Sequence, residues 1–175
     1  QGHLDFTAYG VTTAADEILP FLQNSLFLIK AGFGEQAKLL TFSNNRLVFE
    51  GVDVNSYFAS AASDFLRQKL VDAKISFTME TVMSHVGKVD LLAQAQAAGF
   101  RTYLYFVATD DPAINISRVK SRVKMGGHDV PEDKISERYY RSLDLLIAAI
   151  RHTNRAYIFD NSSENQGHVW LAEIT

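Results

Sequence analysis

The segment RVKSRVKMGGHDVPEDKISERYYRSL, residues 118–143, contains four arginines and three lysines. Five of these cations recur at helical spacing on two expected helices: Arg118, Arg122, Lys134, Arg138 and Arg141. Residues three or four apart share a helix face, and guanidinium groups bind phosphate oxygens through two parallel hydrogen bonds. The pattern therefore indicates two basic helix faces, joined by a turn, that close around a phosphate ligand.

A simpler interpretation remains open for the same segment. Runs of charge are usually solvated helix surfaces, and Glu137 is placed to form an ion pair with Arg141 one turn later. His128 lies in the turn between the helices, where it is either a substrate or phosphate contact or an ordinary turn residue. The pair Tyr139 and Tyr140 is assigned mainly to packing.

A second group of candidates ends the stretch ISFTMET, residues 75–81, which has the β-branched and aromatic residues of a strand. Glu80 lies near its end, Thr78 points to the same side, and Thr81 follows. A carboxylate there can accept a hydrogen bond from a substrate hydroxyl or bind a magnesium-bound water. The alternative is a glutamate that caps the following turn.

The stretch RAYIFDNS, residues 155–162, ends in Asp160 and Asn161 in the same way. These side chains either contact a ligand or form the turn by which the chain leaves a strand. Asp160 is therefore a candidate substrate-binding residue.

Composition limits the kind of ligand. Residues 1–100 carry 7 Lys and Arg against 10 Asp and Glu, whereas residues 118–141 carry 7 against 4. Positive charge gathered in one segment suits a compact anion, while a nucleic acid would more often need a basic surface across the domain. We expect no nucleic-acid partner.

Other features of the composition exclude further classes of protein. The chain has no cysteine, and its five histidines form no HxxxH or HExxH pair, so we expect no transition-metal centre and assign no residue as a metal ligand. No apolar run approaches the roughly 20 residues of a membrane span, and no leader peptide is evident. We expect a cytoplasmic protein without membrane contact.

The elements that must position these residues follow from periodicity and capping. Helices are expected at 14–31, interrupted or kinked at Pro20, and at 55–73, 86–98, 112–125 and 131–152. Strands are expected at 75–81, 101–109, 155–162 and 168–174. In KLLTFSNNRLVFEG a turn is expected at Asn44 and Asn45, with a short strand or extended arm on either side. The run 101–109 is apolar almost throughout, as in a strand covered on both faces. This alternation predicts an α/β domain with a mainly parallel sheet, in which ligands bind at the carboxyl ends of the strands.

Five blocks of the sequence, in this order, resemble the zeta-toxin-like branch of P-loop kinases, often described as predicted ATPases. They are FTMETVMSH, RTYLYFVATDDP, RVKSRV, GGHDVPEDKISERYYRSL and RAYIFDNS. The resemblance implies one α/β kinase-like domain over residues 4–175, with a mainly parallel sheet flanked by helices. Residues 4–51 would be an N-terminal helical insertion and residues 112–152 a helical lid, while Gln-Gly-His at 1–3 resembles a tag remnant.

The resemblance implies an ATP-dependent phosphotransferase that uses Mg²⁺. In zeta toxins the acceptor is a UDP-activated amino sugar, and a small antitoxin protein blocks the nucleotide site. Glu80 matches the family's substrate-side glutamate, and Arg118, Arg122 and Arg138 match its basic region that closes over the phosphates. Together with the candidates identified above from residue type and spacing, three groups of residues are expected to form the site. They are Glu80, Arg122 and Arg138 as catalytic residues; Thr78, Thr81, His128 and Asp160 as substrate-binding residues; and Arg118, Arg122, Lys134, Arg138 and Arg141 as phosphate-binding residues.

One departure from the family pattern is large. Residues 1–175 contain no G-x-x-x-x-G-K-[ST] phosphate loop, and the nearest imitation, GFGEQAK at 32–38, has the wrong spacing. In relatives the loop, its strand and a following aspartate lie upstream, so we expect them to be encoded upstream of Leu4. The alternative is a binding or regulatory module that retains a phosphate-ligand site without transfer chemistry.

Overall fold

The computed structural model of the chain describes residues 2–163 and 167–175. Contacts divide the chain into two compact units, Gln1–Phe77 and Thr78–Thr175. Each unit has its own hydrophobic core. They are therefore described one at a time.

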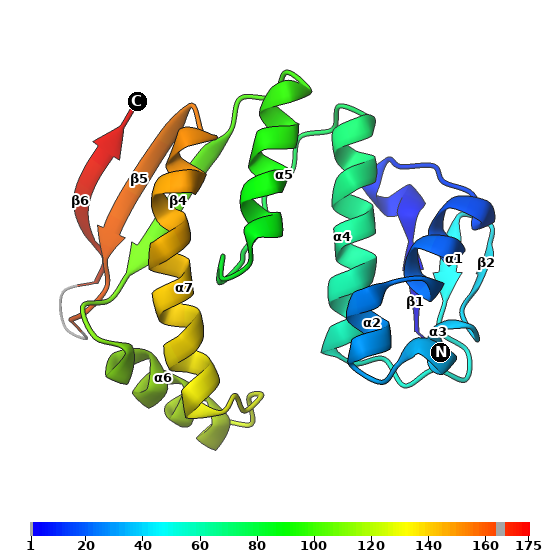
Figure 1. Cartoon of the computed structure of the whole chain (residues 1–175), viewed down its shortest axis with the longest axis horizontal. Coiled ribbons are helices and arrows are strands. Elements are labelled where there is room, and N and C mark those ends of the chain that lie inside the picture. The colour runs from blue at the N-terminus through cyan, green and yellow to red at the C-terminus, as the bar shows by residue number, and fades with distance from the viewer. Residues whose placement is uncertain (1, 164–166) are drawn as a thin grey trace. The chain divides into compact units, whose positions relative to one another are not determined.

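The first unit combines short helices with a three-stranded antiparallel sheet of order β1-β3-β2 (Figure 1). Its elements are β1 (His3–Asp5), the 3-10 helix η1 (Phe6–Tyr9), α1 (Ala15–Gln23), α2 (Leu26–Lys30), α3 (Gly34–Ala37), β2 (Thr41–Ser43), β3 (Arg46–Val48) and α4 (Ser56–Asp72). Residues 4–51 thus contain strands as well as the expected helices.

The hairpin between β2 and β3 confirms the predicted turn. Ser43 faces Arg46, and the two residues between them, Asn44 and Asn45, have φ of 50° and 59°. Asparagine tolerates this left-handed conformation better than most residues, and a two-residue hairpin turn of this kind requires it twice. The Asn45 side chain also donates to the Val11 carbonyl at 2.7 Å, which fixes the preceding loop onto the hairpin.

Helix α4 supplies one wall of the first core and matches the predicted helix. The Asn55 side chain accepts hydrogen bonds from the amides of Tyr57 and Phe58, as an N-cap does. Phe58 and Phe65 are buried, the first against Phe33 and Phe49 and the second against Phe6 and against Phe21 of α1. Burial of each aromatic ring contributes about 1.5 to 3 kcal/mol.

Pro20 lies inside α1, so two of its three predicted effects, an end or a restart of the helix, are wrong. The helix begins at Ala15 and continues through Pro20 to Gln23, so it neither ends nor restarts at the proline. Proline lacks one backbone donor, but the Pro20 carbonyl still accepts from the Asn24 amide at 3.0 Å. The buried residues Ile18 and Leu22 hold both sides of the proline against the core.

The second unit is a three-stranded sheet with helices. Its elements are α5 (Val86–Ala97), β4 (Tyr103–Ala108), α6 (Pro112–Lys124), α7 (Glu132–Arg151), β5 (Arg155–Asp160) and β6 (Val169–Ile174). The strand order is β4-β5-β6, with β4 parallel to β5 and β6 antiparallel at the edge. The parallel pair, the edge strand and the four α-helices of residues 55–152 are confirmed, and the chain is a mixed α/β protein.

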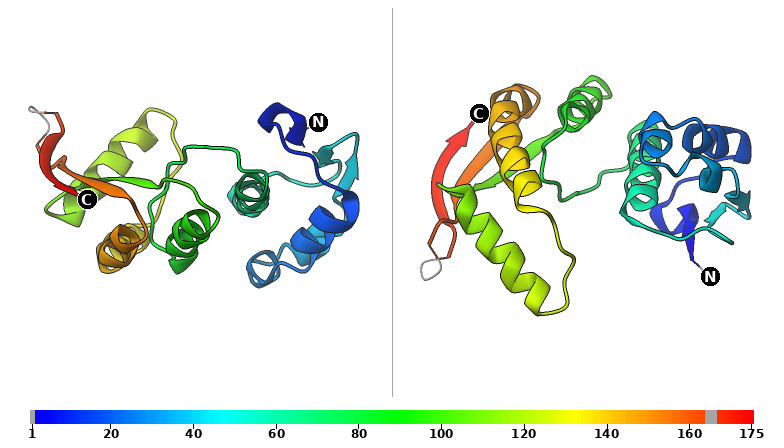
Figure 2. Two further views of the ribbon diagram at one scale, coloured as in Figure 1. Left: turned by 90° about the horizontal axis from the view of Figure 1, so that it is seen from above. Right: turned by 60° about the horizontal axis from the view of Figure 1, so that its bottom comes forward.

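Only one face of this sheet is covered by helices. Helices α5 and α7 lie on the same side (Figure 2), where Val89, Leu104 and Leu146 belong to the second core. On the opposite face Tyr103, Tyr105 and Val107 are 45%, 65% and 50% exposed. The prediction that residues 101–109 are covered on both faces is therefore wrong for the residues that the structure describes.

The predicted strand at 75–81 is also wrong. Residues 75–84 have no regular secondary structure, although side-chain exposure alternates along them as in a strand. Ile75 and Phe77 pack against the first core. A strand exists only when its backbone groups pair with a neighbour, and no described strand pairs with this segment. Residues 75–81 thus have the alternating pattern of a strand but no neighbouring strand to pair with among the described residues.

No helix within residues 2–163 or 167–175 combines the length and apolar character needed to cross a bilayer.

We predict that Glu17→Gln destabilises the first unit in a pH-dependent way. The Lys69 ammonium first, and then the Thr13 hydroxyl, lower the pKa of Glu17 from 4.5 to about 2. A depressed carboxyl pKa contributes stability that is present above pH 4.5 and is lost as pH falls towards 2. Thermal unfolding from pH 7 to 3 should show a lower melting temperature for the variant, with the difference shrinking below pH 4.5.

Glu35→Gln is the matched control for this experiment. Glu35 pairs with Lys38 in the same short exposed segment at 2.6 Å, and such surface pairs contribute little. An equal loss of melting temperature in both variants, or a difference that does not change with pH, would contradict the assigned role of Glu17.

Candidate functional site

The carboxyl ends of β4 and β5 form one edge of the parallel pair. Ala108 lies opposite Asp160 in the register, and the Asn161 amide extends the ladder by donating to the Ala108 carbonyl at 2.8 Å. The residues that follow each strand are therefore brought together, as the rule for parallel sheets requires. The candidate site is built from this edge and from α6 and α7, which leave and approach it (Figure 1).

Asp160 lies at this edge and forms the predicted turn. Its Oδ1 accepts hydrogen bonds from the Ser162 amide at 2.9 Å and from the Ser162 hydroxyl. The same hydroxyl oxygen accepts from the Asp110 amide at 2.9 Å, which joins the loop after β5 to the loop after β4. The geometry supports the turn interpretation for Asp160, while its role in substrate binding stays a prediction.

The end of β4 is connected to both helices of residues 112–152. The side-chain amide of Asn115, on α6, donates from its Nδ2 to the Thr109 hydroxyl at 2.8 Å. The Tyr139 hydroxyl, on α7, donates to the Thr109 carbonyl at 2.8 Å. Burial, followed by the nearby Tyr140 and the carboxylates of Asp110 and Asp111, raises the pKa of Tyr139 above its ordinary value. The Tyr139 hydroxyl therefore remains a donor well into the alkaline range.

Arg118 and Arg122 each donate to a backbone carbonyl. Arg118 is half-buried, and its Nη2 lies 2.7 Å from the carbonyl oxygen of Asn161. Arg122 is exposed, and its Nη2 lies 3.1 Å from the carbonyl oxygen of His128. Both arginines thus form hydrogen bonds to nearby backbone carbonyls. Neither of these contacts is evidence for phosphate binding.

Two further cations of the same segment form ion pairs on the surface. Lys120 on α6 pairs with Glu132 on α7 at 2.6 Å, and Arg141 pairs with Glu137 at 3.3 Å. The second pair is the i,i+4 pair that the sequence indicated as the simpler alternative. Arg141 is therefore partly neutralised by its own helix.

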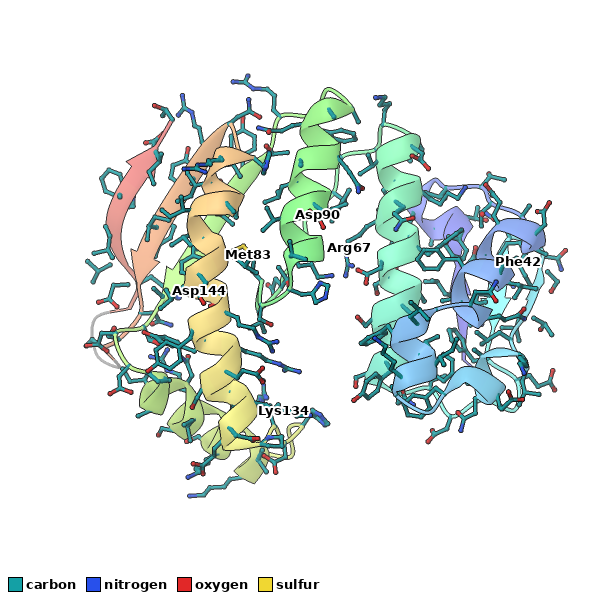
Figure 3. The ribbon with its side chains drawn as sticks, viewed as in Figure 1. Phe42, Arg67, Met83, Asp90, Lys134 and Asp144 are labelled. Carbon is teal, nitrogen blue, oxygen red and sulfur yellow. The ribbon has the colours of Figure 1, made fainter. Side chains whose placement is uncertain are left out.

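Lys134 and Arg138 differ from these cations. Both are exposed, they lie four apart on α7, and neither forms a hydrogen bond or ion pair within the part of the chain that the structure describes. Figure 3 shows Lys134 near the start of α7, at the end of the helix that is distant from its junction with β5. Lys124, the last residue of α6, is likewise exposed and forms no such contact among the described residues. These three cations of the segment are therefore available to an external anion, and two of them share one face of α7.

The turn between α6 and α7 is closely packed. Gly126 has φ of +87°, and a Cβ on Gly127 would lie 2.5 Å from Cγ of Arg122 and 2.9 Å from its carbonyl oxygen. Glycine at 127 therefore allows the Arg122 side chain to lie over the turn that carries His128, which is exposed. No contact of the His128 side chain tests its predicted role.

The second group of predicted residues lies in the segment before α5. Thr78 and Glu80 are exposed, and the Thr81 hydroxyl accepts from the Met83 amide at 3.1 Å. Met83 is buried in the second core with φ of 55° (labelled in Figure 3), an uncommon conformation for a methionine. Burial of this side chain fixes the end of the segment, whereas the Glu80 carboxylate is left available to a ligand.

The sequence did not identify the residues that connect the strand ends. Thr109, Asn115 and Ser162 were not selected, and Tyr139 was assigned mainly to packing. The place of Thr109 in the sequence could have identified it, because Thr109 comes directly after β4, just as Asp160 comes at the end of β5. Within residues 2–163 and 167–175, no group of three or more His, Cys, Asp or Glu is placed to hold a metal ion.

Comparison with known proteins gives a family match. The family model described as Zeta toxin matches residues 50–168. A protein of Haemophilus influenzae described as "Uncharacterized protein" is 35% identical over 65 residues, which are 37% of this chain and 46% of that protein. The chain thus spans about half the length of the curated relative it matches. No solved structure matches the chain.

We predict that Tyr139→Phe lowers the free energy of unfolding by about 1 kcal/mol at neutral pH, because one hydrogen bond to Thr109 is lost. A raised tyrosine pKa contributes stability that is present below pH 10, the ordinary value, and is lost as pH rises through the pKa of the folded state. The difference between parent and variant should therefore shrink above pH 10. Denaturant unfolding at several pH values measures it.

Tyr140→Phe is the control for this substitution. Tyr140 is 57% exposed, and its ring contacts Tyr139. Equal losses in the two variants would contradict a specific role for the Tyr139 hydroxyl.

Proposed function

The chain belongs to the zeta toxin family, and from this premise we propose that it carries the acceptor-binding and lid parts of an ATP-dependent phosphotransferase. The observation that carries the proposal is the pair Lys134 and Arg138. These exposed cations share one face of α7 without an internal partner among the described residues. Two positive charges held on a rigid helix suit the phosphate chain of a nucleotide.

The expected free energies differ between a binding role and a solvated surface for these two residues, so substitution can distinguish the two roles. A charge-assisted hydrogen bond to phosphate contributes about 1.5 to 3 kcal/mol, whereas an exposed ion pair contributes about 0 to 1 kcal/mol. Arg141, which pairs with Glu137, is a secondary phosphate contact in this proposal. Arg122 is exposed, and its guanidinium retains donors beyond the one used by His128, so it can join Arg138 in stabilising charge on the transferred group.

Glu80 is the proposed acceptor-side residue. Its carboxylate is exposed and has no hydrogen bond or ion pair to another described residue, so it can accept a hydrogen bond from an acceptor hydroxyl and orient it. Thr78 and Thr81 lie beside it in the chain and offer hydroxyl groups. His128, in the turn that follows α6, and Asp160, at the end of β5, are proposed contacts to the acceptor. The acceptor class is a small phosphorylated compound or a nucleotide sugar, as the family resemblance implies.

The second sheet supports a P-loop kinase fold that is completed by another strand. Strand β4 pairs only with β5 among the described strands, so its other edge has free backbone donors and acceptors. Tyr103–Ala108 contains no charged residue, and the face with Tyr105 is exposed. A strand added beside β4 would satisfy these groups, and a helix following it would cover Tyr105. We assign this place to the strand and helix that carry the phosphate loop in the family.

The strand proposed beside β4 also explains why residues 75–81 have a strand pattern without a pairing partner. Their side chains alternate in exposure as in a strand, and the new strand would provide a partner for them. Glu80 would then lie at the carboxyl edge, beside the ends of β4 and β5, as the sequence predicted. The fold then becomes a single kinase-like domain with a mainly parallel sheet and the helical lid 112–152.

ATP fits the cations that this chain provides, and it supplies the transferred phosphoryl group when bound. The described residues contain no metal-ligating cluster, so no residue of this chain is assigned to Mg²⁺, which the family uses. Use of ATP as the phosphoryl donor implies a cytoplasmic enzyme. A protein that occupies the same nucleotide site, as an antitoxin does in the family, is the proposed protein partner.

A binding or regulatory module is the second candidate. Arg118, Arg122 and Arg141 all have partners within the chain, as expected when a basic segment stabilises its own fold. Such a module would bind the phosphate ligand through Lys134 and Arg138 without transferring a group.

We predict that Lys134→Ala and Arg138→Ala each weaken ATP binding by about tenfold or more, because each removes one charge-assisted contact. Calorimetric titration of ATP into the protein encoded by the full gene measures the affinity. Arg151→Ala, which removes an exposed arginine from the opposite end of α7, is the matched control and should leave the affinity unchanged. Affinities within twofold of the parent for both variants, in protein that remains folded, would reject the phosphate site.

We predict that Glu80→Gln lowers the rate of phosphoryl transfer from ATP to UDP-N-acetylglucosamine by about 10² to 10⁴ and leaves ATP affinity within twofold, because the carboxylate acts on the acceptor hydroxyl. Transfer by the full protein is followed with radiolabelled ATP. Tight ATP binding by the parent without transfer to any nucleotide sugar would contradict the kinase and support the binding module.

A further inference from the structure

Two side chains of the lid, residues 112–152, bind backbone carbonyls at the carboxyl ends of the two parallel strands. Arg118 on α6 donates to the Asn161 carbonyl after β5 at 2.7 Å, and Tyr139 on α7 donates to the Thr109 carbonyl after β4 at 2.8 Å. These two contacts, here called the tethers, connect each lid helix to the end of a different strand.

We infer that Arg118 is a positioning residue that fixes the base of the lid, in place of the phosphate-ligand role expected from the sequence. With Tyr139 it confines lid movement to residues 119–138, here called the lid tip. We further infer that this movement brings Lys134 and Arg138 to a phosphate ligand. Only this part of the inference rests on the proposed function. The tethers themselves are contacts of the structure.

The end of each tether on the sheet is rigid. The Asn161 amide is paired with the Ala108 carbonyl at 2.8 Å, so the backbone that presents the Asn161 carbonyl continues the ladder between the strands. The Ser162 hydroxyl accepts from the Asp110 amide at 2.9 Å and joins the two loops a second time. A guanidinium bound to such a backbone holds α6 in one position, and the bond is charge-assisted.

Arg118 is also more enclosed than the other basic residues of the lid. It is half-buried, whereas Arg122, Lys134 and Arg138 are exposed. A bond from a charged group that is partly removed from water contributes more than the same bond on the surface. The environment of Arg118 therefore favours a structural contact over an exchangeable ligand contact.

The lid tip is held less firmly than its base. The ion pair between α6 and α7 in the tip joins Lys120 and Glu132, whose side chains are 62% and 58% exposed, and such pairs contribute about 0 to 1 kcal/mol. The Arg122 guanidinium also donates to the His128 carbonyl at 3.1 Å, but this bond is exposed and links α6 only to the turn. The turn contains Gly126 in a left-handed conformation, and glycine has the greatest backbone freedom. The contrast between a firm base and a weakly linked tip is the arrangement that a closing lid requires.

The residues available to bind phosphate lie within the tip. Lys134 and Arg138 are both located between the two tethers along the chain, on the part of α7 that precedes Tyr139. Movement of the tip therefore carries both cations together, while residues after Tyr139 remain packed in the second core through Leu145 and Leu146.

The test is hydrogen exchange and ATP titration on the same variants of the full-gene protein. Arg118→Ala is expected to accelerate exchange of the amides of Asn161 and Ser162 and of the first turns of α6 by at least tenfold, with helix α4 of the first unit unchanged. Arg118→Lys, which keeps one charged donor, should restore part of this protection. Arg138→Ala should weaken ATP binding and leave exchange at Asn161 and Ser162 unchanged.

Two results would overturn the inference. One is unchanged exchange at Asn161 and Ser162 in Arg118→Ala. The other is a loss of ATP affinity in Arg118→Lys as large as in Arg138→Ala, which would make Arg118 a phosphate ligand. If the parent protein does not bind ATP, the proposed function fails, and the exchange measurements on Arg118→Ala and Arg118→Lys still decide whether Arg118 is the tether.

Discussion

The parallel pairing of β4 with β5 is the constraint on which the second unit depends. Because Ala108 and Asp160 lie opposite each other, Thr109 and Asn161 leave the sheet at the same edge. The carbonyls of these two residues then receive Tyr139 and Arg118, so the register of the strands sets the spacing of the two points at which α6 and α7 are held. A shift of one residue would turn the side chains of one strand to the other face and would change that spacing.

The basic segment illustrates why a count of charges does not identify a binding site. Within the lid, Arg118 and Arg122 hold backbone carbonyls, and Lys120 and Arg141 form ion pairs with Glu132 and Glu137. After these internal uses are subtracted, Lys124, Lys134 and Arg138 remain as the cations of the segment without a partner among the described residues, and only Lys134 and Arg138 share a helix face. The same segment thus serves both the fold and the proposed ligand, through different residues.

Local sequence signals predicted the helices well, because their causes are local. Asn55 caps α4, Gly99 with φ of +89° follows the end of α5, and Pro112 begins α6, each as expected. The parallel pair and its edge strand were also predicted correctly, but two other predictions that needed a distant partner were wrong. Residues 75–81 have the alternation of a strand without a pairing edge, and Tyr105 lies on a face that no described element covers, because pairing and covering are set by other segments. For the candidate site, residue types identified the segments, while contacts were needed to assign the individual roles.

We propose that this chain provides the acceptor side and the lid of a kinase whose phosphate-loop strand lies beside β4. The most direct measurement is a crystal structure of the full-gene protein with a non-hydrolysable ATP analogue. We expect a strand parallel to β4 on its open edge, a helix over Tyr105, and phosphate oxygens within hydrogen-bond distance of Lys134 and Arg138. An unpaired β4 edge in that structure, or phosphates bound away from both of these side chains, would contradict it.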